Sequence, residues 1–584
     1  MTQPPTKVEA GKPEKKNGIM ITTEKYGCRA VAGILRGHGV RRVVLCPGSR
    51  DLPLVMAFAR EEGMKCCTAI DERSAAFIAL GQAIGSGEAV AVVCTSGTAL
   101  LNMAPAVAEA YYRNVPLIVV SADRPGRWID QADSQTLRQP AALTSVVKRS
   151  YNIVAEGEKD DERWYIDRIV NDAAIAATTG KRGPVHINVE IDEPLNKEAE
   201  VSGEYRIIRR AETRMSLSDD DRKRLASEML GCSKVLVLAG NMAPCDVLNK
   251  ALMRLGENGN VAILTEPLAN VSAGIRNIEA TLSILGSERR EKMRPELLIT
   301  MGGAIVSGLT KKWLRKGVKA HWHIGEGDET MDTFKCLTER IDMKPADFFR
   351  ETATVMRRGT VYGGENSDYG EKWREASKRA YNAVERGIEA AEWSDVKALN
   401  EIVKMLPGDA NVQLSNGMTV RYYEWVSERK AHRTDCNRGV SGIDGSTSTA
   451  IGAASVSKGM TVFMTGDMSA QYDIGALASL RLVEPAGRFK MVVFANGGGN
   501  IFKYIKNTRD TAETPEFLYN SVDTDWKGVG EAYGMAVYEA TDMTSLKKQG
   551  EEWMRESERS ALLIVGSDAE VNAQVMINLV KSNK

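Results

Sequence analysis

Short apolar segments alternate with helical stretches through almost the whole chain, and this alternation constrains the fold more than any other feature. Parallel strands need a crossover of about a dozen residues, usually a helix, so the pattern predicts parallel sheets covered by helices. The expected strands form three groups: 42–46, 89–94, 117–121 and 185–189; 235–239, 261–265, 297–301 and 320–324; and 412–415, 461–465, 491–494, 535–539 and 562–565. We therefore expect an α/β protein of three domains, each a mostly parallel sheet flanked by helices.

Polar stretches near 196–210 and 357–372 interrupt the alternation and divide the 584 residues. We expect a disordered tail at 1–18, a first domain at 19–197, a central α/β domain at 198–365 and a third domain at 366–584. The tail is rich in Pro, Lys, Glu and Gly and lacks the apolar core of a signal peptide. No apolar run reaches about 18 residues, so we expect no membrane-spanning helix.

The charge balance and the cysteines exclude several classes of protein. Lysine plus arginine and aspartate plus glutamate are 77 each, so net charge provides no general attraction for nucleic acid or anionic membranes. The nine cysteines form no CxxC pair and no zinc spacing; Cys46, Cys66, Cys67 and Cys94 fall in or beside segments expected to be buried strands. An odd number of cysteines without a signal peptide predicts free thiols in a reducing cytoplasm.

Two neighbouring expected strands end in residues that suit a divalent metal. The strand 461–465 runs into Gly466 and Asp467, and the strand 491–494 runs into Asn496 and the glycines 497–499. A right-handed β-α-β unit places both ends at one edge of a sheet, where ligands bind in open α/β folds. A carboxylate, an amide oxygen and a backbone carbonyl are hard ligands that Mg²⁺ shares with phosphates. Taken alone, an ordinary β-α-β unit with polar strand ends explains the pattern equally well.

Two further segments favour a cofactor site. Glu72 begins an apolar helix after a short strand. An isolated acidic pair such as Asp71-Glu72 would ordinarily interact favourably with the helix dipole. Glu72, however, borders the apolar face, where a partly buried carboxylate can share a proton. The glycine-rich turn 437–445 opens a helix of small residues, and such turns bind phosphate through free N–H groups. A metal-bound diphosphate and a partly buried glutamate are what thiamine diphosphate requires, since its thiazolium carbon must lose a proton.

On these residues the chain resembles the thiamine diphosphate enzymes of the pyruvate decarboxylase and acetolactate synthase superfamily. It resembles most closely the 2-succinyl-5-enolpyruvyl-6-hydroxy-3-cyclohexene-1-carboxylate synthase family of menaquinone biosynthesis. The segments that carry this closer resemblance are 46–50, 71–77, 94–99, 122–125, 437–445, 466–469 and 497–502. They lie toward both ends of the chain, whereas the middle third resembles the family mainly in architecture.

The resemblance implies a homodimer or homotetramer with active sites between subunits, and thiamine diphosphate with Mg²⁺ or Mn²⁺ as cofactors. The first domain would bind the pyrimidine, with Glu72 as the catalytic residue that promotes its imino tautomer. The third domain would bind the diphosphate, with the metal held by Asp467, Asn496 and the Gly498 carbonyl. Further cofactor contacts implied by the resemblance are Gly466, Ser441, Ser469 and Ile443. Helix capping or turn bonding explains each serine equally well, and Ile443 alone would be read as core.

The implied reaction is decarboxylation of 2-oxoglutarate and addition of the succinyl-semialdehyde carbanion equivalent to isochorismate, with release of CO2. Both substrates are dianions, which arginine binds through bidentate hydrogen bonds. The substrate residues implied by the resemblance are Ser49, Arg50, Arg124, Gln135, Arg421, Arg438, Ile501 and Phe502.

The chain departs from the family pattern at two places. Gly308 and Leu309 stand where the family often has a basic pair, so Lys311 or Lys312 would have to compensate. Gly417 stands where a serine is expected, so one hydrogen bond to substrate is in doubt.

Two other functions stay open on the residues alone. One is another thiamine diphosphate-dependent 2-oxo acid carboligase or decarboxylase, for instance one that acts on pyruvate. The arginine set argues against it, because pyruvate has one carboxylate, and the chain also lacks the adjacent histidine pair of the pyruvate-type decarboxylases. The other is a non-enzymatic scaffold or regulatory subunit, against which the presence of Glu72, Asp467 and Asn496 argues.

Overall fold

The computed structural model describes residues 20–327, 329–356, 367–426, 433–519 and 522–581. The chain divides into two compact units, one that ends at Ala211 and one that begins at Glu212. The tail predicted at 1–18 and the boundary predicted between 365 and 366 lie outside the described residues, and the domain boundaries stay predictions. Within the described ranges, no helix is long and apolar enough to cross a membrane.

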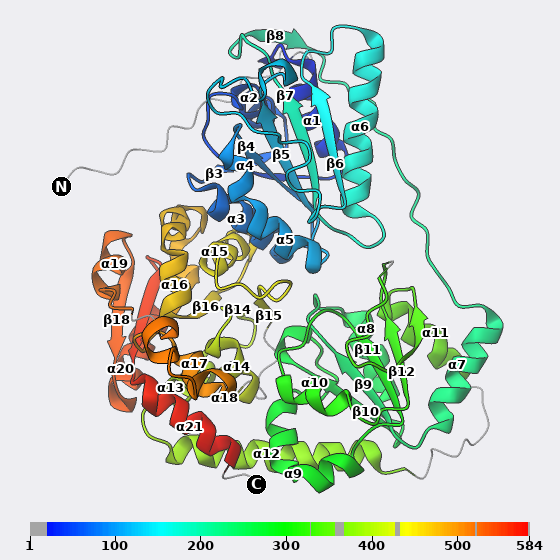
Figure 1. The fold of residues 1–584 in the computed structure, drawn as a ribbon, viewed down its shortest axis with the longest axis vertical. Coiled ribbons are helices and arrows are strands. Elements are labelled where there is room, and N and C mark those ends of the chain that lie inside the picture. The colour runs from blue at the N-terminus through cyan, green and yellow to red at the C-terminus, as the bar shows by residue number, and fades with distance from the viewer. Residues whose placement is uncertain (1–19, 328, 357–366, 427–432, 520–521, 582–584) are drawn as a thin grey trace. The chain divides into compact units, whose positions relative to one another are not determined.

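The first unit is built on a six-stranded parallel sheet with the order β3-β2-β4-β5-β7-β6. Its strands are β2 (Arg42–Leu45), β3 (Lys65–Thr68), β4 (Val90–Cys94), β5 (Leu117–Asp123), β6 (Arg149–Val154) and β7 (Val185–Glu190). Its helices are α1 (Tyr26–Gly37), α2 (Leu52–Arg60), α3 (Glu72–Ser86), α4 (Thr98–Asn102), α5 (Ala104–Tyr112) and α6 (Asp160–Thr178). The strands β1 (Met20–Thr23) and β8 (Glu198–Val201) form a separate antiparallel pair. In Figure 1 this unit runs from blue to cyan, and most of its elements are labelled.

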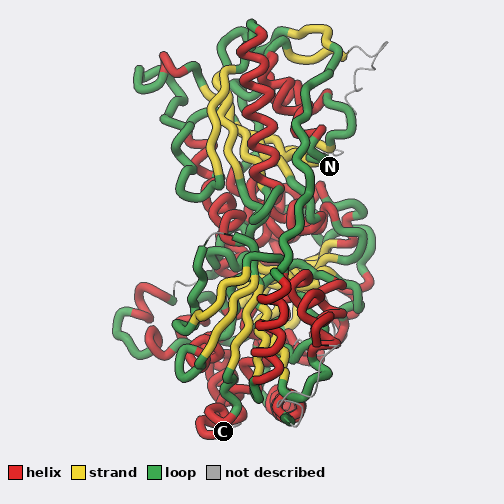
Figure 2. Tube along the Cα trace, turned by 90° about the vertical axis from the view of Figure 1, so that its right-hand side faces the viewer, coloured by secondary structure: helices red, strands yellow, loops and turns green. Residues whose placement is uncertain are grey.

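The second unit contains two more parallel sheets, with the orders β10-β9-β11-β12-β13 and β15-β14-β16-β17-β19-β18. The first is made of β9 (Val235–Ala239), β10 (Val261–Thr265), β11 (Leu297–Met301), β12 (Ala320–Ile324) and β13 (Leu337–Ile341). The second is made of β14 (Asn411–Leu414), β15 (Arg433–Cys436), β16 (Thr461–Gly466), β17 (Phe489–Ala495), β18 (Ala536–Ala540) and β19 (Ala561–Gly566). In both units helices lie against the strands (Figure 2). The predicted fold class, three parallel sheets flanked by helices, is confirmed.

The helices of the second unit connect these strands. Those of its first half are α7 (Asp219–Gly231), α8 (Asp246–Leu255), α9 (Ile278–Lys292), α10 (Gly308–Leu314) and α11 (Pro345–Met356). Those of its second half are α12 (Tyr369–Ala390), α13 (Asp395–Met405), α14 (Met418–Val426), α15 (Ser446–Val456), α16 (Asp467–Tyr472), α17 (Asn500–Tyr504), α18 (Lys506–Arg509), α19 (Trp526–Ala532), α20 (Met543–Arg555) and α21 (Ala569–Lys581).

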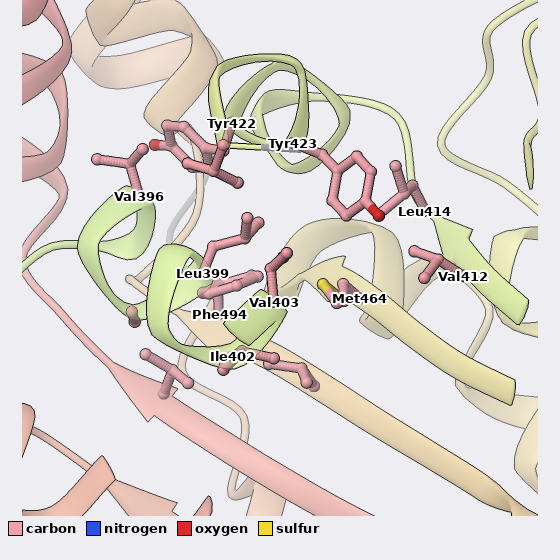
Figure 3. Close-up of a cluster of buried hydrophobic side chains, with 14 of the residues drawn as sticks. Val396, Leu399, Ile402, Val403, Val412, Leu414, Tyr422, Tyr423, Met464 and Phe494 are labelled. Atoms are coloured by element: carbon pink, nitrogen blue, oxygen red, sulfur yellow. The ribbon is translucent and has the colours of Figure 1, made fainter. Parts of the chain in front are cut away.

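A buried apolar cluster packs α13 and α14 against the last sheet. Leu399 of α13 and Tyr422 of α14 lie with Val412 of β14, Met464 of β16 and Phe494 of β17 (Figure 3). Burial of each such side chain stabilises the fold by about 1.5–3 kcal/mol. The cluster therefore fixes the two helices that begin beside the carboxyl ends of these strands.

The predicted strands are all present, and those of the middle group have the predicted bounds, for example Val235–Ala239. Continuous apolar runs such as Val235–Ala239 are typical of strands that are buried on both faces. All nine cysteines are free, as predicted. The expectation that Cys66 is buried is wrong, because β3 is an edge strand and its Cys66 side chain is exposed. The helix expected after Asp467 is a short α16 followed by the 3-10 helix η4 (Ile474–Leu482).

Candidate active site

In the first unit, the loops that follow β2, β3, β4 and β5 lie at one edge of the sheet, because these neighbouring strands are parallel. Ser49 and Arg50 follow β2, and Glu72 is the first residue of α3 after β3. The loop after β2 packs tightly against the residue that follows β4: a Cβ on Gly48 would lie 2.3 Å from the Cβ of Thr95. The predicted residues Ser49, Arg50 and Glu72 are thus brought to one edge.

Arg124 and Gln135 lie in the segment after β5, next to the loop that follows β4. The Gln135 amide nitrogen donates to the Ser96 carbonyl at 2.8 Å, and the Ser96 hydroxyl donates to the Gln135 carbonyl at 2.9 Å. Arg124 pairs with Asp133 at 2.5 Å and keeps 24% of its side chain exposed. Arg50 is buried, and its guanidinium donates to the Ile191 carbonyl at 3.1 Å. Arg124 therefore has more room for a ligand than Arg50 has.

In the second unit, Asp467 joins the ends of β16 and β17. Gly466 is in register with Phe494, so both strands end at one edge as predicted. Asp467 is 3% exposed, and its Oδ2 accepts the backbone N–H groups of Asn496 and Gly498, both at 3.0 Å. Burial raises the pKa of Asp467, and these backbone hydrogen bonds oppose that rise. The carboxylate thereby holds the glycine loop against the start of α16.

The Asn496 side chain is oriented by a second carboxyl group that sequence reasoning missed. Its amide nitrogen donates to Asp395 Oδ2 at 2.8 Å, and its amide oxygen accepts the Gly498 N–H at 3.2 Å. Asp395 is 1% exposed; its other oxygen accepts the Ser567 hydroxyl at 2.5 Å, and its N–H donates to Asn572 at 2.7 Å. This network directs the oxygen of the Asn496 amide toward the glycine loop, which is the orientation a metal ligand needs.

The donor set around Asp467 fits a hard divalent ion. The Asp467 carboxylate, the Asn496 amide oxygen and the Gly498 carbonyl could hold Mg²⁺ or Mn²⁺ together with diphosphate oxygens. No group of three or more His, Cys, Asp and Glu side chains suited to a metal occurs in the described part of the chain. Gly497, Gly498 and Gly499 have φ of 83°, 84° and 67°, and a Cβ on Gly499 would lie 2.4 Å from the Tyr519 carbonyl oxygen. Only glycine fits this turn without strain.

The remaining predicted cofactor residues line the same edge of the second unit. The Ser469 hydroxyl donates to the Ile443 carbonyl at 2.8 Å, so it ties α16 to the turn before α15. This contact matches the turn-bonding interpretation of Ser469. Ser441 has a φ of 64° in that turn, and both Ser441 and Ile443 are partly exposed. Gly466 is the last residue of β16.

Arg421 and Arg438 lie close enough to influence each other. Burial lowers the pKa of Arg421, and the charge of Arg438 adds to this effect. Arg438 is 9% exposed; one of its nitrogens donates to Asn416 at 3.0 Å, and its Nε has no hydrogen-bond partner among the described residues. Two partly desolvated guanidinium groups with donors to spare suit an anionic ligand. Ile501 and Phe502 are partly buried residues of α17, and Ile501 packs against the cluster of Figure 3.

Of the two lysines proposed to replace the displaced basic pair, Lys311 lies near the arginines. Burial lowers its pKa; the positive charge of Arg438 lowers it further, and the carboxylate of Glu266 opposes both. Lys312 is exposed. Around Gly308, by contrast, there is open space: apart from its chain neighbours and the backbone of α10, no described atom lies within 4 Å of where its Cβ would be.

Three glutamates surround these cations and were also missed by sequence reasoning. Glu266 is 1% exposed and accepts the N–H groups of Val306 and Ser307 at 2.6 and 2.7 Å. Glu424 is 3% exposed, and neither of its oxygens has a partner among the described residues. Burial raises the pKa of Glu266, Glu279 and Glu424. The carboxyls are therefore shifted toward neutral acids, which leaves positive charge available for a dianionic ligand. The only local signal in the sequence is that Glu424 follows Arg421 by three positions on one helix.

Residues 26–142 match the family described as thiamine pyrophosphate enzyme, N-terminal TPP binding domain. With its three parallel sheets, the chain is thus a thiamine pyrophosphate-dependent enzyme.

Curated 2-succinyl-5-enolpyruvyl-6-hydroxy-3-cyclohexene-1-carboxylate synthases match nearly its whole length. That of Porphyromonas gingivalis is 34% identical over 563 residues, which cover 95% of this chain and 96% of the relative. That of Bacteroides fragilis is 36% identical over 547 residues, covering 93% and 95%. That of Flavobacterium psychrophilum is 34% identical over 565 residues, covering 95% and 98%. The chain belongs to this synthase family.

The Asp395 network predicts an effect on metal affinity. Asp395→Ala frees the Asn496 amide to rotate. The measurement is the melting temperature at fixed thiamine diphosphate as Mg²⁺ is added, and the midpoint is the Mg²⁺ concentration that gives half of the total rise. This midpoint should increase roughly tenfold to a hundredfold in the variant. The control is Asp473→Ala, which removes another buried aspartate whose carboxylate bonds Ser448. That variant should lose stability with an unchanged Mg²⁺ midpoint. Equal midpoints for both variants and the parent would contradict the orienting role.

Proposed function

We infer that this chain catalyses the thiamine diphosphate-dependent decarboxylation of 2-oxoglutarate and the addition of the remaining succinyl unit to isochorismate. The products are 2-succinyl-5-enolpyruvyl-6-hydroxy-3-cyclohexene-1-carboxylate and CO2, in menaquinone biosynthesis. The observation that carries this inference is the 34% and 36% identity to synthases of that name over 95% and 93% of the chain. The residues at the two sheet edges supply the chemistry that this reaction needs.

When bound, the cofactor would supply an acidic carbon. Its deprotonated form can add to a 2-oxo group, and the cofactor can then accept the electron pair that remains when CO2 departs. We assign Glu72 to the pyrimidine ring, where its carboxyl holds a proton at a ring nitrogen. Asp467, Asn496 and the Gly498 carbonyl would hold Mg²⁺ or Mn²⁺ on the diphosphate. Asp395 keeps the Asn496 oxygen turned to the metal.

Charge selects the substrates. A dianion such as 2-oxoglutarate or isochorismate needs more than one cation, and an ion pair in a partly desolvated site is stronger than in water. Arg421, Arg438 and Lys311 form such a group in the second unit. We assign Ser49, Arg50, Arg124 and Gln135 of the first unit to further polar contacts, and Ile501 and Phe502 to an apolar wall. Pyruvate, with one carboxylate, would leave part of this positive charge unpaired.

Product analysis tests the reaction directly. With both substrates, thiamine diphosphate and Mg²⁺, mass spectrometry should detect the succinyl adduct of isochorismate and an equal amount of CO2. Omission of isochorismate should abolish the adduct. Replacement of 2-oxoglutarate by pyruvate should lower the rate by at least tenfold, because one carboxylate contact to a charged group is lost. A comparable rate with pyruvate would favour the alternative carboligase.

We propose that the active form is a homo-oligomer, at least a dimer, in the cytoplasm, in which Glu72 of one subunit serves the cofactor held by Asp467 of another. Glu72→Gln and Asp467→Ala should each be nearly inactive as pure proteins. A mixed dimer of the two variants contains one site with both residues intact, so refolding them together should restore activity. No recovery, with mixed dimers shown by native mass spectrometry, would place both residues of each site in one chain.

Single substitutions should separate substrate binding from cofactor binding. Arg421→Ala, Arg438→Ala and Lys311→Ala should each lower kcat/KM roughly tenfold to a hundredfold, because each removes a hydrogen bond to a charged group. Lys312→Ala is the matched control, since Lys312 is exposed, and should keep the parent value. The thiamine diphosphate concentration for half-saturation should change little in all four. Full efficiency of the arginine variants would show that the substrate carboxylates bind elsewhere.

A further inference from the structure

Asp51 is a buried carboxyl group that no part of the proposed mechanism uses. It lies directly after the loop that follows β2 and before α2, and it is 0% exposed. An aspartate at this position would ordinarily cap the helix, yet its side chain makes no capping hydrogen bond. Neither carboxyl oxygen has a hydrogen-bond partner among the described residues. Because buried polar groups are nearly always bonded, Asp51 needs an explanation other than helix capping.

The charges around Asp51 are negative. The negative charge of Glu72, at the start of α3, raises the pKa of the Asp51 carboxyl. Both carboxyls also raise the pKa of the thiols of Cys46 and Cys94, at the ends of β2 and β4. Asp71 also acts on Cys46. The cation that is nearest along the chain, Arg50, donates instead to the Ile191 carbonyl and to Glu193. Arg73, the residue after Glu72, pairs with Asp71 at 3.7 Å. No cation is therefore among the described groups that act on the Asp51 carboxyl.

A buried carboxyl with no cation beside it and an acidic group nearby ionises less readily than one in water. Burial, helped by the charge of Glu72, raises the pKa of Asp51 from 3.8 to about 7. Asp51 therefore keeps its proton below about pH 7. A neutral Asp51 also explains why its oxygens tolerate burial better than an unpaired carboxylate would.

We propose that Asp51 is a positioning residue of the Glu72 site: it stays protonated near neutral pH, so that this buried carboxyl places no charge of its own beside Glu72. This inference rests on the role proposed for Glu72. Asp51 acts through Glu72 and needs no contact with the ring itself.

The experiment compares the parent with Asp51→Asn, which has nearly the same shape but no titration. Because the folded-state pKa of Asp51 is raised, its stabilising contribution is complete below about pH 4 and is lost as the pH rises through about 7. The cofactor-free Asp51→Asn protein should therefore melt at a higher temperature than the parent at pH 8, and the difference should shrink at pH 5. Should this variant not fold, Asp51→Leu carries the same test.

The pH profile of activity distinguishes a functional role from a structural one. In the parent, kcat should fall above about pH 7, as Asp51 loses its proton, with little change in KM. Asp51→Asn should shift or abolish this limb. The matched control is Asp71→Asn, which also removes a carboxylate next to Glu72, but an exposed one that caps α3, where asparagine caps equally well. It should keep the parent profile and the parent melting temperature.

A pH-independent difference in melting temperature, or an Asp51→Asn profile that matches the parent, would overturn the role of Asp51. Full activity of Glu72→Gln would instead overturn the proposed role of Glu72. The melting experiment needs neither cofactor nor turnover, so the two failures can be told apart.

Discussion

The site of the second unit depends on one buried carboxylate, that of Asp467, which accepts hydrogen bonds across the ends of two parallel strands. Asp467 starts α16 at the end of β16 and accepts backbone N–H groups from the loop after β17. The parallel register brings the two strand ends level, and the carboxylate then determines the path of the three glycines. Since each of those glycines has a positive φ, the loop could not follow this path with larger residues. Local backbone chemistry and sheet topology thus act together to collect oxygen donors.

The substrate end of the site shows a different balance. Arg421, Arg438 and Lys311 would repel one another if nothing compensated for their charge, and the desolvation of each adds to the cost. Glu266, Glu279 and Glu424 supply compensation from nearby helices and loops. Because burial raises the pKa of these carboxyls, the compensation is incomplete. Such a site can fold empty and still attract a dianion. The departure at Gly308 and Leu309 is compatible with this arrangement, because Lys311, one helical turn farther on, brings a positive charge to the arginine pair.

Asp51 and Asp395 illustrate two opposite uses of a buried aspartate. Asp395 is fully bonded, to Asn496, Ser567 and Asn572, and its network imposes one orientation on an amide. The Asp51 carboxyl is bonded to none of the described residues, and its burial instead raises its pKa beside Glu72. A bonded group adds to the stability of the fold, whereas an unbonded one subtracts from it. A buried carboxyl that lowers stability, at a sheet edge that also carries Glu72, is typical of functional sites.

The sequence by itself determined the fold class and the oxygen donors at the strand ends, because both follow from local pattern. Apolar runs such as Val235–Ala239 that alternate with helical stretches predict buried strands, and the Gly466-Asp467 and Asn496 positions follow from where such strands stop. Strands with polar residues, such as Arg149–Val154 and Arg433–Cys436, have no such pattern and were missed. Tertiary structure alone decided that Asp395 lies against Asn496, 101 positions away, that Lys311 and not Lys312 lies near the arginines, and that Asp51 is buried without a partner. These are contacts between elements brought together by packing, and no periodicity along the chain records them.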